Sequence, residues 1–198
     1  MPVIPKILVI AGSIRAGAFS GRTADVAQKT LALEGAEVTR LSLADYPLPI
    51  MDEDLERERG VPDNAMKLAR QIAAHDGVLI ATPEYNGSIP PLLKNAIDWV
   101  SRVRRDNGKA LRPLAGKPAG LCSSSAGHFA GIRAANHLRA VLVRCQMEVV
   151  TPECSVPDGN AAFDEAGNFR DERLLKSMEV LCRTLTQAAR QVSARIEP

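Results

Sequence analysis

Short, almost continuous apolar runs alternate along the chain with longer segments in which apolar positions recur every three or four residues. The run KILVIA at residues 6–11 is closed by Gly12, and VLIA at residues 78–81 has the same character. Runs of this kind are typical of strands buried on both faces of a parallel sheet. Three further strands are predicted at residues 37–43, whose alternating pattern indicates an exposed edge, at 117–122 and at 147–150.

Five amphipathic segments separate or follow these strands. Ser20 is suited to cap a helix over residues 20–33, and Gly35 lies just past its end. Another helix begins at Pro62 and places an apolar stripe along residues 65–73. The remaining helices are predicted from the Pro90-Pro91 pair through residue 100, at 134–145 and at 174–192.

Five strands that alternate with five helices predict one α/β domain over residues 1–198, with a doubly wound parallel sheet and helices on both faces. Right-handed crossovers favour the strand order 2-1-3-4-5. Ligands of such sheets bind beyond the carboxyl ends of the strands, at the switch point between the first and third strands. Two stretches without a clear pattern, residues 44–61 and 151–170, are either surface meander or segments that pack on a partner.

The composition excludes several classes of protein. A formal net charge of +2 gives no electrostatic basis for binding nucleic acid or an anionic membrane. No apolar run approaches the roughly 18 residues that a membrane-spanning helix needs. The first residues also lack the basic start, apolar stretch and cleavage site of a signal peptide, so a cytoplasmic protein is expected.

The cysteines and histidines do not form a recognisable site. No CxxC pair occurs among the four cysteines, which favours free thiols in a reducing compartment. The histidines are scattered, so no metal site is expected, and no GxSxG nucleophile elbow is present. These residues are His75, His128, His137, Cys122, Cys145, Cys154 and Cys182.

The segment after the first strand leads from a buried strand into a helix start. Unpaired N–H groups and the helix dipole make such a position favourable for an anion. The hydroxyls of Ser13 and Ser20 add donors, and Arg15 adds a guanidinium that matches phosphate geometry. The segment is therefore either a phosphate cradle or a plain β–α turn.

The spacing of Gly12 and Gly17 resembles that of a P-loop, but the rest of that motif is missing. Ala18 and Phe19 stand where a P-loop needs Lys and then Ser or Thr, which excludes an ATPase of that type. The dinucleotide fingerprint GxGxxG is also absent. A site for a monophosphate is the phosphate chemistry that remains.

The segments after the third and fourth strands should lie beside this loop. Tyr85 offers a flat apolar surface for an aromatic ring, and Asn86-Gly87 suits a tight turn whose N–H groups can face a ligand. Residues 123–131 (SSSAGHFAG) are small enough to let a ring edge approach the backbone. Taken singly, each segment is also compatible with an ordinary β–α connection.

Together these segments resemble the NADPH-dependent FMN reductase family of the flavodoxin-like fold, and within it the bacterial chromate and quinone reductase branch. The resemblance rests on GSIR at residues 12–15, PEYN at 83–86, LKNAIDW at 93–99 and LAGKP at 114–118. It implies an FMN cofactor. Asn95, Asp98 and Trp99 belong to the shared block, but we interpret them as helix packing and capping residues and not as ligands.

The resemblance also implies which residues bind FMN. The phosphate would be held by Ser13, Arg15, Phe19 and Ser20. Family members often carry a hydroxyl residue where this chain has Ala18, so one phosphate donor would be missing and the affinity for FMN lower. The isoalloxazine would be wrapped by Pro83, Glu84, Tyr85, Asn86 and Gly87 and bordered by Ser124, Ser125 and Gly127.

The implied reaction passes hydride from NADPH or NADH through flavin N5 to a small-molecule acceptor, in a ping-pong scheme that needs no protein acid, base or nucleophile. Quinones, free flavin, chromate and azo compounds are the implied acceptors, and a homodimer or homotetramer is the implied assembly. Two alternatives stay open. A non-enzymatic electron carrier is usually strongly acidic, unlike this chain, and an FMN-binding sensor module would use the fold to hold a nucleotide or to interact with a partner.

Overall fold

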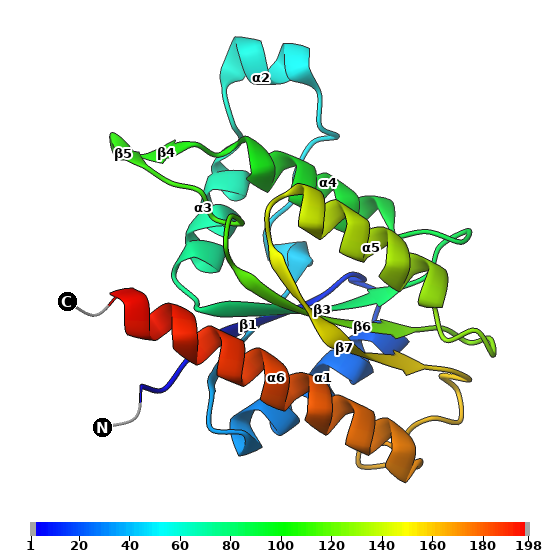
Figure 1. Ribbon diagram of the computed structural model, residues 1–198. Helices are drawn as coiled ribbons and strands as arrows, with labels where there is room; N and C mark the ends of the chain where they lie inside the picture. Colours follow the sequence, from blue (N-terminus) through cyan, green and yellow to red (C-terminus); the bar gives the residue numbers. More distant parts are fainter. Residues whose placement is uncertain (1–2, 197–198) are drawn as a thin grey trace.

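The computed structural model describes residues 3–196, except for the side chains of residues 195 and 196. Its centre is a five-stranded parallel sheet in the order β2-β1-β3-β6-β7 (Figure 1). This confirms the predicted order 2-1-3-4-5, because a short β4–β5 hairpin lies outside the sheet. The strands are β1 (Lys6–Ala11), β2 (Glu37–Leu41), β3 (Gly77–Pro83), β6 (Pro118–Ser124) and β7 (Glu148–Val156).

Helices cover both faces of the sheet (Figure 1). Alternate residues of β1 divide between the two faces: Ile7 and Val9 pack with one set of helices, whereas Leu8 and Ile10 pack with the other. One face carries α1 (Phe19–Leu33) and α6 (Glu172–Ile196), and the other carries α3 (Asp63–Ala73), α4 (Pro91–Arg102) and α5 (Ile132–Arg144).

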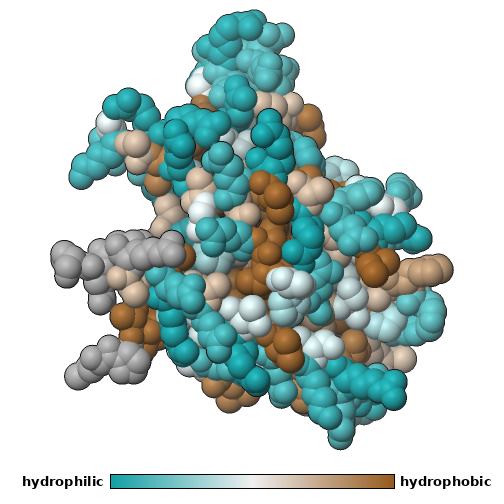
Figure 2. All heavy atoms as spheres, in the orientation of Figure 1, coloured by the Kyte–Doolittle hydropathy of each residue, from teal (hydrophilic) through white to brown (hydrophobic). Residues whose placement is uncertain are grey.

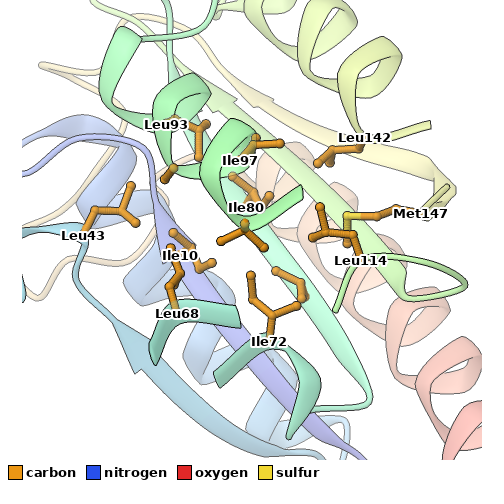
Figure 3. Close-up of a pocket in the computed structure, with 13 residues that line it drawn as sticks. Ile10, Leu43, Leu68, Ile72, Ile80, Leu93, Ile97, Leu114, Leu142 and Met147 are labelled. Atoms are coloured by element: carbon orange, nitrogen blue, oxygen red, sulfur yellow. The ribbon is translucent and has the colours of Figure 1, made fainter. Parts of the chain in front are cut away.

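A small cavity of about 30 Å³ lies in the core between β1, β3 and the helices α3 and α4 (Figure 3). Ile10 and Ile80 line it from the sheet, and Ile72 and Ile97 line it from the helices. A buried water needs about two to four polar partners, and this lining offers only apolar side chains. The cavity is therefore an imperfection of packing and lies apart from the predicted flavin loops.

Residues 44–61 are more ordered than predicted. They include part of a 3₁₀ turn (Leu43–Asp45) and the helix α2 (Glu53–Arg59), which has no buried residue. Figure 2 shows hydrophilic side chains covering this projecting helix, as expected for its charged residues. The preceding segment is fixed on α4, because Asn95 Nδ2 and Trp99 Nε1 each donate to the carbonyl of Pro49 over 2.8 Å. The packing role expected for Asn95 and Trp99 is thus observed.

Other element boundaries differ from the sequence prediction. The edge strand β2 ends at Leu41, two residues earlier than predicted, because the chain turns into the 3₁₀ turn. The last strand was predicted too short, since β7 runs to Val156 and takes up part of the stretch 151–170. A hairpin of β4 (Arg105–Asp106) and β5 (Lys109–Ala110), turning at Asn107-Gly108, was not predicted.

Candidate flavin site

The start of α1 carries unpaired hydrogen-bond donors at the end of β1. The helix begins at Phe19, and Ala18 is its N-cap, so the predicted capping by Ser20 is wrong. Ser20 lies inside the first turn, fully buried, and its Oγ has no partner among the described residues. The backbone N–H groups of Phe19, Ser20 and Gly21 have no acceptor there either. Such donors need an acceptor from a ligand or from water, and a phosphate fits them.

Ser13 and Arg15 form the outer part of this loop. Ser13 Oγ accepts from Arg15 N over 3.3 Å, and Gly17 has the left-handed φ of +67° that lets the chain turn back into the helix. The Arg15 guanidinium is exposed and makes only a 3.4 Å contact with the carbonyl of Ala16. It is therefore available to pair with an anion at the helix start.

The second loop adopts the tight turn that Asn86-Gly87 predicts. Both residues have positive φ values, +50° and +77°, as a type I′ turn requires. Tyr85 and Ser88 close the turn through paired backbone hydrogen bonds of 2.9 and 3.0 Å, and the Tyr85 side chain is 47% exposed. An exposed aromatic ring on a rigid turn supplies a surface against which a flat ligand can lie.

The first two loops touch directly. Gly12 N donates to the carbonyl of Ala81 over 2.8 Å. A Cβ on Gly12 would lie 3.1 Å from Pro83 Cδ and 3.2 Å from Leu93 Cδ2, so no larger residue fits without displacing them. Glycine at this position therefore allows the loop after β1 and the Tyr85 loop to approach closely.

Glu84 is held by a residue that sequence reasoning missed. Arg133, in the first turn of α5, donates from Nε to Glu84 Oε1 over 2.8 Å and also donates from Nη2. Its guanidinium lies 5.3 Å from the centre of the Phe129 ring. The second carboxylate oxygen, Glu84 Oε2, is buried and has no partner among the described residues. An N–H group of a ligand could satisfy this acceptor.

The third loop is supported by a segment that was also missed. Ser124 ends β6 and is buried, and its Oγ has no partner in the described part of the chain, whereas Ser125 Oγ donates to the carbonyl of Gly127 over 2.9 Å. Gly159 N donates to Ser125 O over 2.9 Å, and a Cβ on Gly159 would fall 2.5 Å from Phe19 Cγ. Residues 157–160 thus join the third loop to the first. The sequence feature that could have predicted a turn in this segment is the Asp-Gly pair that follows β7, since this dipeptide is typical of turns.

Comparison with known proteins identifies the family. A family model for NADPH-dependent FMN reductase matches residues 5–161. The chain belongs to this family. It is 45% identical over 139 residues to a quinone reductase of Escherichia coli (strain K12), covering 70% of this chain and 69% of that protein. It is 36% identical over 170 residues to an NAD(P)H-dependent FMN reductase of Pseudomonas aeruginosa, covering 85% and 86% respectively.

Solved structures agree with this assignment. The flavoenzyme NAD(P)H:(acceptor) oxidoreductase of Paracoccus denitrificans has a TM-score of 0.77 and 26% sequence identity, over 95% of this chain and 98% of that one. As a member of the NADPH-dependent FMN reductase family, the chain is an oxidoreductase with FMN as cofactor and NAD(P)H as co-substrate. Because the members of this family are enzymes, the family assignment does not favour the two alternatives, an electron carrier and a sensor module.

The cysteines lie outside the flavin loops. The four thiols are free. Cys122 on β6 lies directly opposite Cys154 on the neighbouring strand β7. Burial raises the pKa of the Cys154 thiol to about 12 and raises that of Cys122 well above its ordinary value.

Within residues 3–196 no group of three His, Cys, Asp or Glu side chains could hold a metal ion. No helix in that range is long and apolar enough to cross a membrane.

Proposed function

We propose that the chain is an FMN-dependent NAD(P)H:quinone reductase whose flavin lies across the carboxyl ends of β1, β3 and β6. The observation that carries the proposal is the meeting of unpaired donors at the start of α1 with an exposed aromatic turn at Tyr85, beside a loop of small residues. The donors match a terminal phosphate, and the turn and small loop match a flat ring.

The residues divide into a phosphate group and a ring group. Arg15, Ser13 and Ser20 hold the phosphate together with the backbone N–H groups at the start of α1, where Phe19 also contributes. The ring is wrapped by Pro83, Glu84, Tyr85, Asn86 and Gly87 and bordered by Ser124, Ser125 and Gly127.

Bound FMN would supply the redox chemistry, as the carrier of hydride from NAD(P)H to an acceptor. The chain's own groups bind and orient. The Asn86-Gly87 turn offers backbone N–H groups to the ring edge, and Glu84, held by Arg133, offers an acceptor. We propose a ping-pong order, in which the oxidised nicotinamide leaves before the acceptor binds on the same open face.

A quinone is the acceptor that we favour, because several relatives at 30–45% identity are named quinone reductases and a planar quinone can stack on an open ring face. Steady-state oxidation of NADPH and of NADH by the FMN-loaded protein tests this, with a quinone, free FMN, chromate and an azo dye as acceptors. Parallel lines in double-reciprocal plots with the quinone are expected. Absence of quinone-dependent oxidation by a fully FMN-loaded sample would contradict the proposal.

We also propose that the chain forms a homodimer, or a homotetramer built from it, with the flavin near the interface. Large apolar side chains are exposed around the carboxyl-end loops, namely Ile14, Tyr85, Phe129 and Ile132. A second subunit would cover them and exclude water from the flavin. The free thiols support a reducing compartment, and the cytoplasm is the location that we propose.

A further inference from the structure

A second concave surface lies at the amino ends of the strands, opposite the carboxyl ends that carry the candidate flavin loops. It is a groove of about 470 Å³ between the C-terminal end of α4, the C-terminal end of α5 and the segment that leads into β6. Arg104 and Arg112, which flank the β4–β5 hairpin, both line it. Four of the residues that line the groove are arginines, Arg102, Arg104, Arg112 and Arg144, and none is Asp or Glu.

Three of these arginines are not neutralised by the protein. Arg102 pairs with Glu56 over 2.7 Å. For Arg104, Arg112 and Arg144, residues 3–196 provide no ion pair and no side-chain hydrogen bond. Elsewhere in the fold, guanidinium groups are often engaged by carboxylates, as Arg70, Arg133 and Arg139 are.

Helix capping does not account for Arg144. Arginine near the end of a helix can pair with the last carbonyl groups. Here the carbonyls of Val141, Leu142 and Val143 already accept from the backbone N–H groups of residues 145, 147 and 146. The positive charge of Arg144 is thus free for another acceptor.

The arginines also stand on fixed backbone. Leu111 N donates to Arg104 O over 2.9 Å, which closes the base of the hairpin. The hairpin is tied to α3 by the pair of Arg70 with Asp106, at 2.6 and 2.8 Å. Arg112 precedes a buried proline, Pro113. The backbone positions from which these arginines project into the groove are therefore set by the fold.

We propose that this groove binds an anion with two linked phosphate groups, a pyrophosphate moiety that is either free or part of a nucleotide. Planar guanidinium groups pair with phosphate oxygens through two parallel hydrogen bonds, and three such groups supply enough donors for the oxygens of two linked phosphates. The volume lies within the roughly 300–1,000 Å³ typical of small-molecule sites. The site is independent of the flavin and of the proposed reaction.

Calorimetric titration of the full-length, FMN-loaded protein with inorganic pyrophosphate tests the proposal at about 0.15 M salt, where long-range attraction is screened. Loaded FMN keeps the flavin phosphate site occupied. Saturable binding of one pyrophosphate per chain is expected for the unmodified protein. The double variant Arg112→Gln/Arg144→Gln should bind at least tenfold more weakly.

A charge-matched control separates a built site from general attraction. Arg173→Gln/Lys176→Gln removes two exposed positive charges on α6, which contributes no residue to the lining of the groove, and should leave the affinity unchanged. Equal weakening in both double variants, or no binding by the unmodified protein, would overturn the proposal. Titration with ADP distinguishes the sources: tighter binding than pyrophosphate indicates a nucleotide, and equal binding indicates the free anion.

Cys145 provides a second readout from within the groove. It lines the groove and is partly exposed, whereas Cys122, Cys154 and Cys182 are buried. Saturating pyrophosphate should slow alkylation of Cys145 several-fold in the unmodified protein and not in the groove variant. An unchanged alkylation rate at saturation would place the bound anion elsewhere and overturn the assignment.

Discussion

At the scale of single residues, Arg15 is the side chain whose effect on FMN affinity is easiest to isolate. It is exposed and makes only one long contact, so Arg15→Ala should leave the fold intact. Losing a charge-assisted pair with phosphate costs about 1.5–3 kcal/mol, roughly tenfold or more in affinity. Fluorescence titration of apoprotein with FMN measures the change, with Arg59→Ala as the control. An unchanged dissociation constant would refute the phosphate assignment.

Thiol reactivity should separate the four cysteines. Burial raises the pKa of each thiol, so the reactive thiolate is scarcer at neutral pH than for a free cysteine. We expect iodoacetamide to label Cys145 alone in the folded protein, because the other three are buried. The rate should still be rising with pH above the ordinary cysteine pKa of about 8.5.

Peptide mass analysis would identify the labelled thiol, and Cys145→Ser should abolish labelling. The labelled enzyme should keep its rate of quinone reduction, since Cys145 lies near the amino ends of the strands, opposite the candidate flavin loops. Labelling of Cys122 or Cys154 at a comparable rate would show that the core opens far more readily than its burial indicates.

At the scale of elements, the exposed edge strand β7 is protected by one arginine. Residues 150–152 bulge opposite Gly120 of β6, and Arg139 Nη2 donates to the carbonyl of Val150 over 2.9 Å while its Nε donates to Glu153 Oε1 over 2.9 Å. A bulge and a charge on an edge strand both discourage pairing with another chain.

Arg139→Ala should therefore lower the free energy of unfolding by about 1–3 kcal/mol, because the carbonyl and the carboxylate both lose their partner. It should also increase aggregation on heating. Chemical denaturation and light scattering measure the two effects, with the exposed Arg173→Ala as the matched control. Equal stability of the two variants would argue against this role for Arg139.

The contact between residues 157–160 and the start of α1 should be sensitive to a single methyl group. In Gly159→Ala the new Cβ would fall 2.5 Å from Phe19 Cγ, so the ring must move. Overpacking of this kind costs about 1–3 kcal/mol, and we expect weaker FMN binding because the helix start shifts with the ring.

The double variant Phe19→Leu/Gly159→Ala should recover part of the lost stability, which thermal unfolding would measure. Gly127→Ala is the control for unfolding, because its Cβ would meet no atom closer than 4.0 Å. If Gly159→Ala melts at the same temperature as Gly127→Ala, the two segments are not packed as described.

At the scale of the whole molecule, the proposed dimer should depend on the apolar surface around the flavin loops. Phe129→Ser/Ile132→Ser removes two exposed apolar side chains that are not part of the buried core. We expect the unmodified protein to elute as a dimer or tetramer in light scattering coupled to size exclusion, and the variant to dissociate on dilution. A fully active, FMN-loaded monomer of 21.3 kDa would contradict the interface.

Most of the sheet could be predicted from local pattern. The apolar run at residues 6–11 matches β1 at both ends. The switch-point rule, applied to the sequence alone, predicted that the three loops lie together. The boundaries that failed have local causes. Ser20 carries the chemistry of an N-cap but lies buried inside the helix, and β7 continues through Pro152 because a bulge accommodates a residue that usually interrupts strands.

The sequence by itself determined the order of strands, the family, and the loops that we propose for the flavin, because these depend on periodicity, on the handedness of crossovers and on short motifs. Only the tertiary structure decided which distant side chains meet. Arg133 meets Glu84, Gly159 lies against Phe19, and the arginines that line the groove come from α5 as well as from the segments around the hairpin. Contacts of that kind are fixed by how helices pack on the sheet, and no local pattern of residues records them.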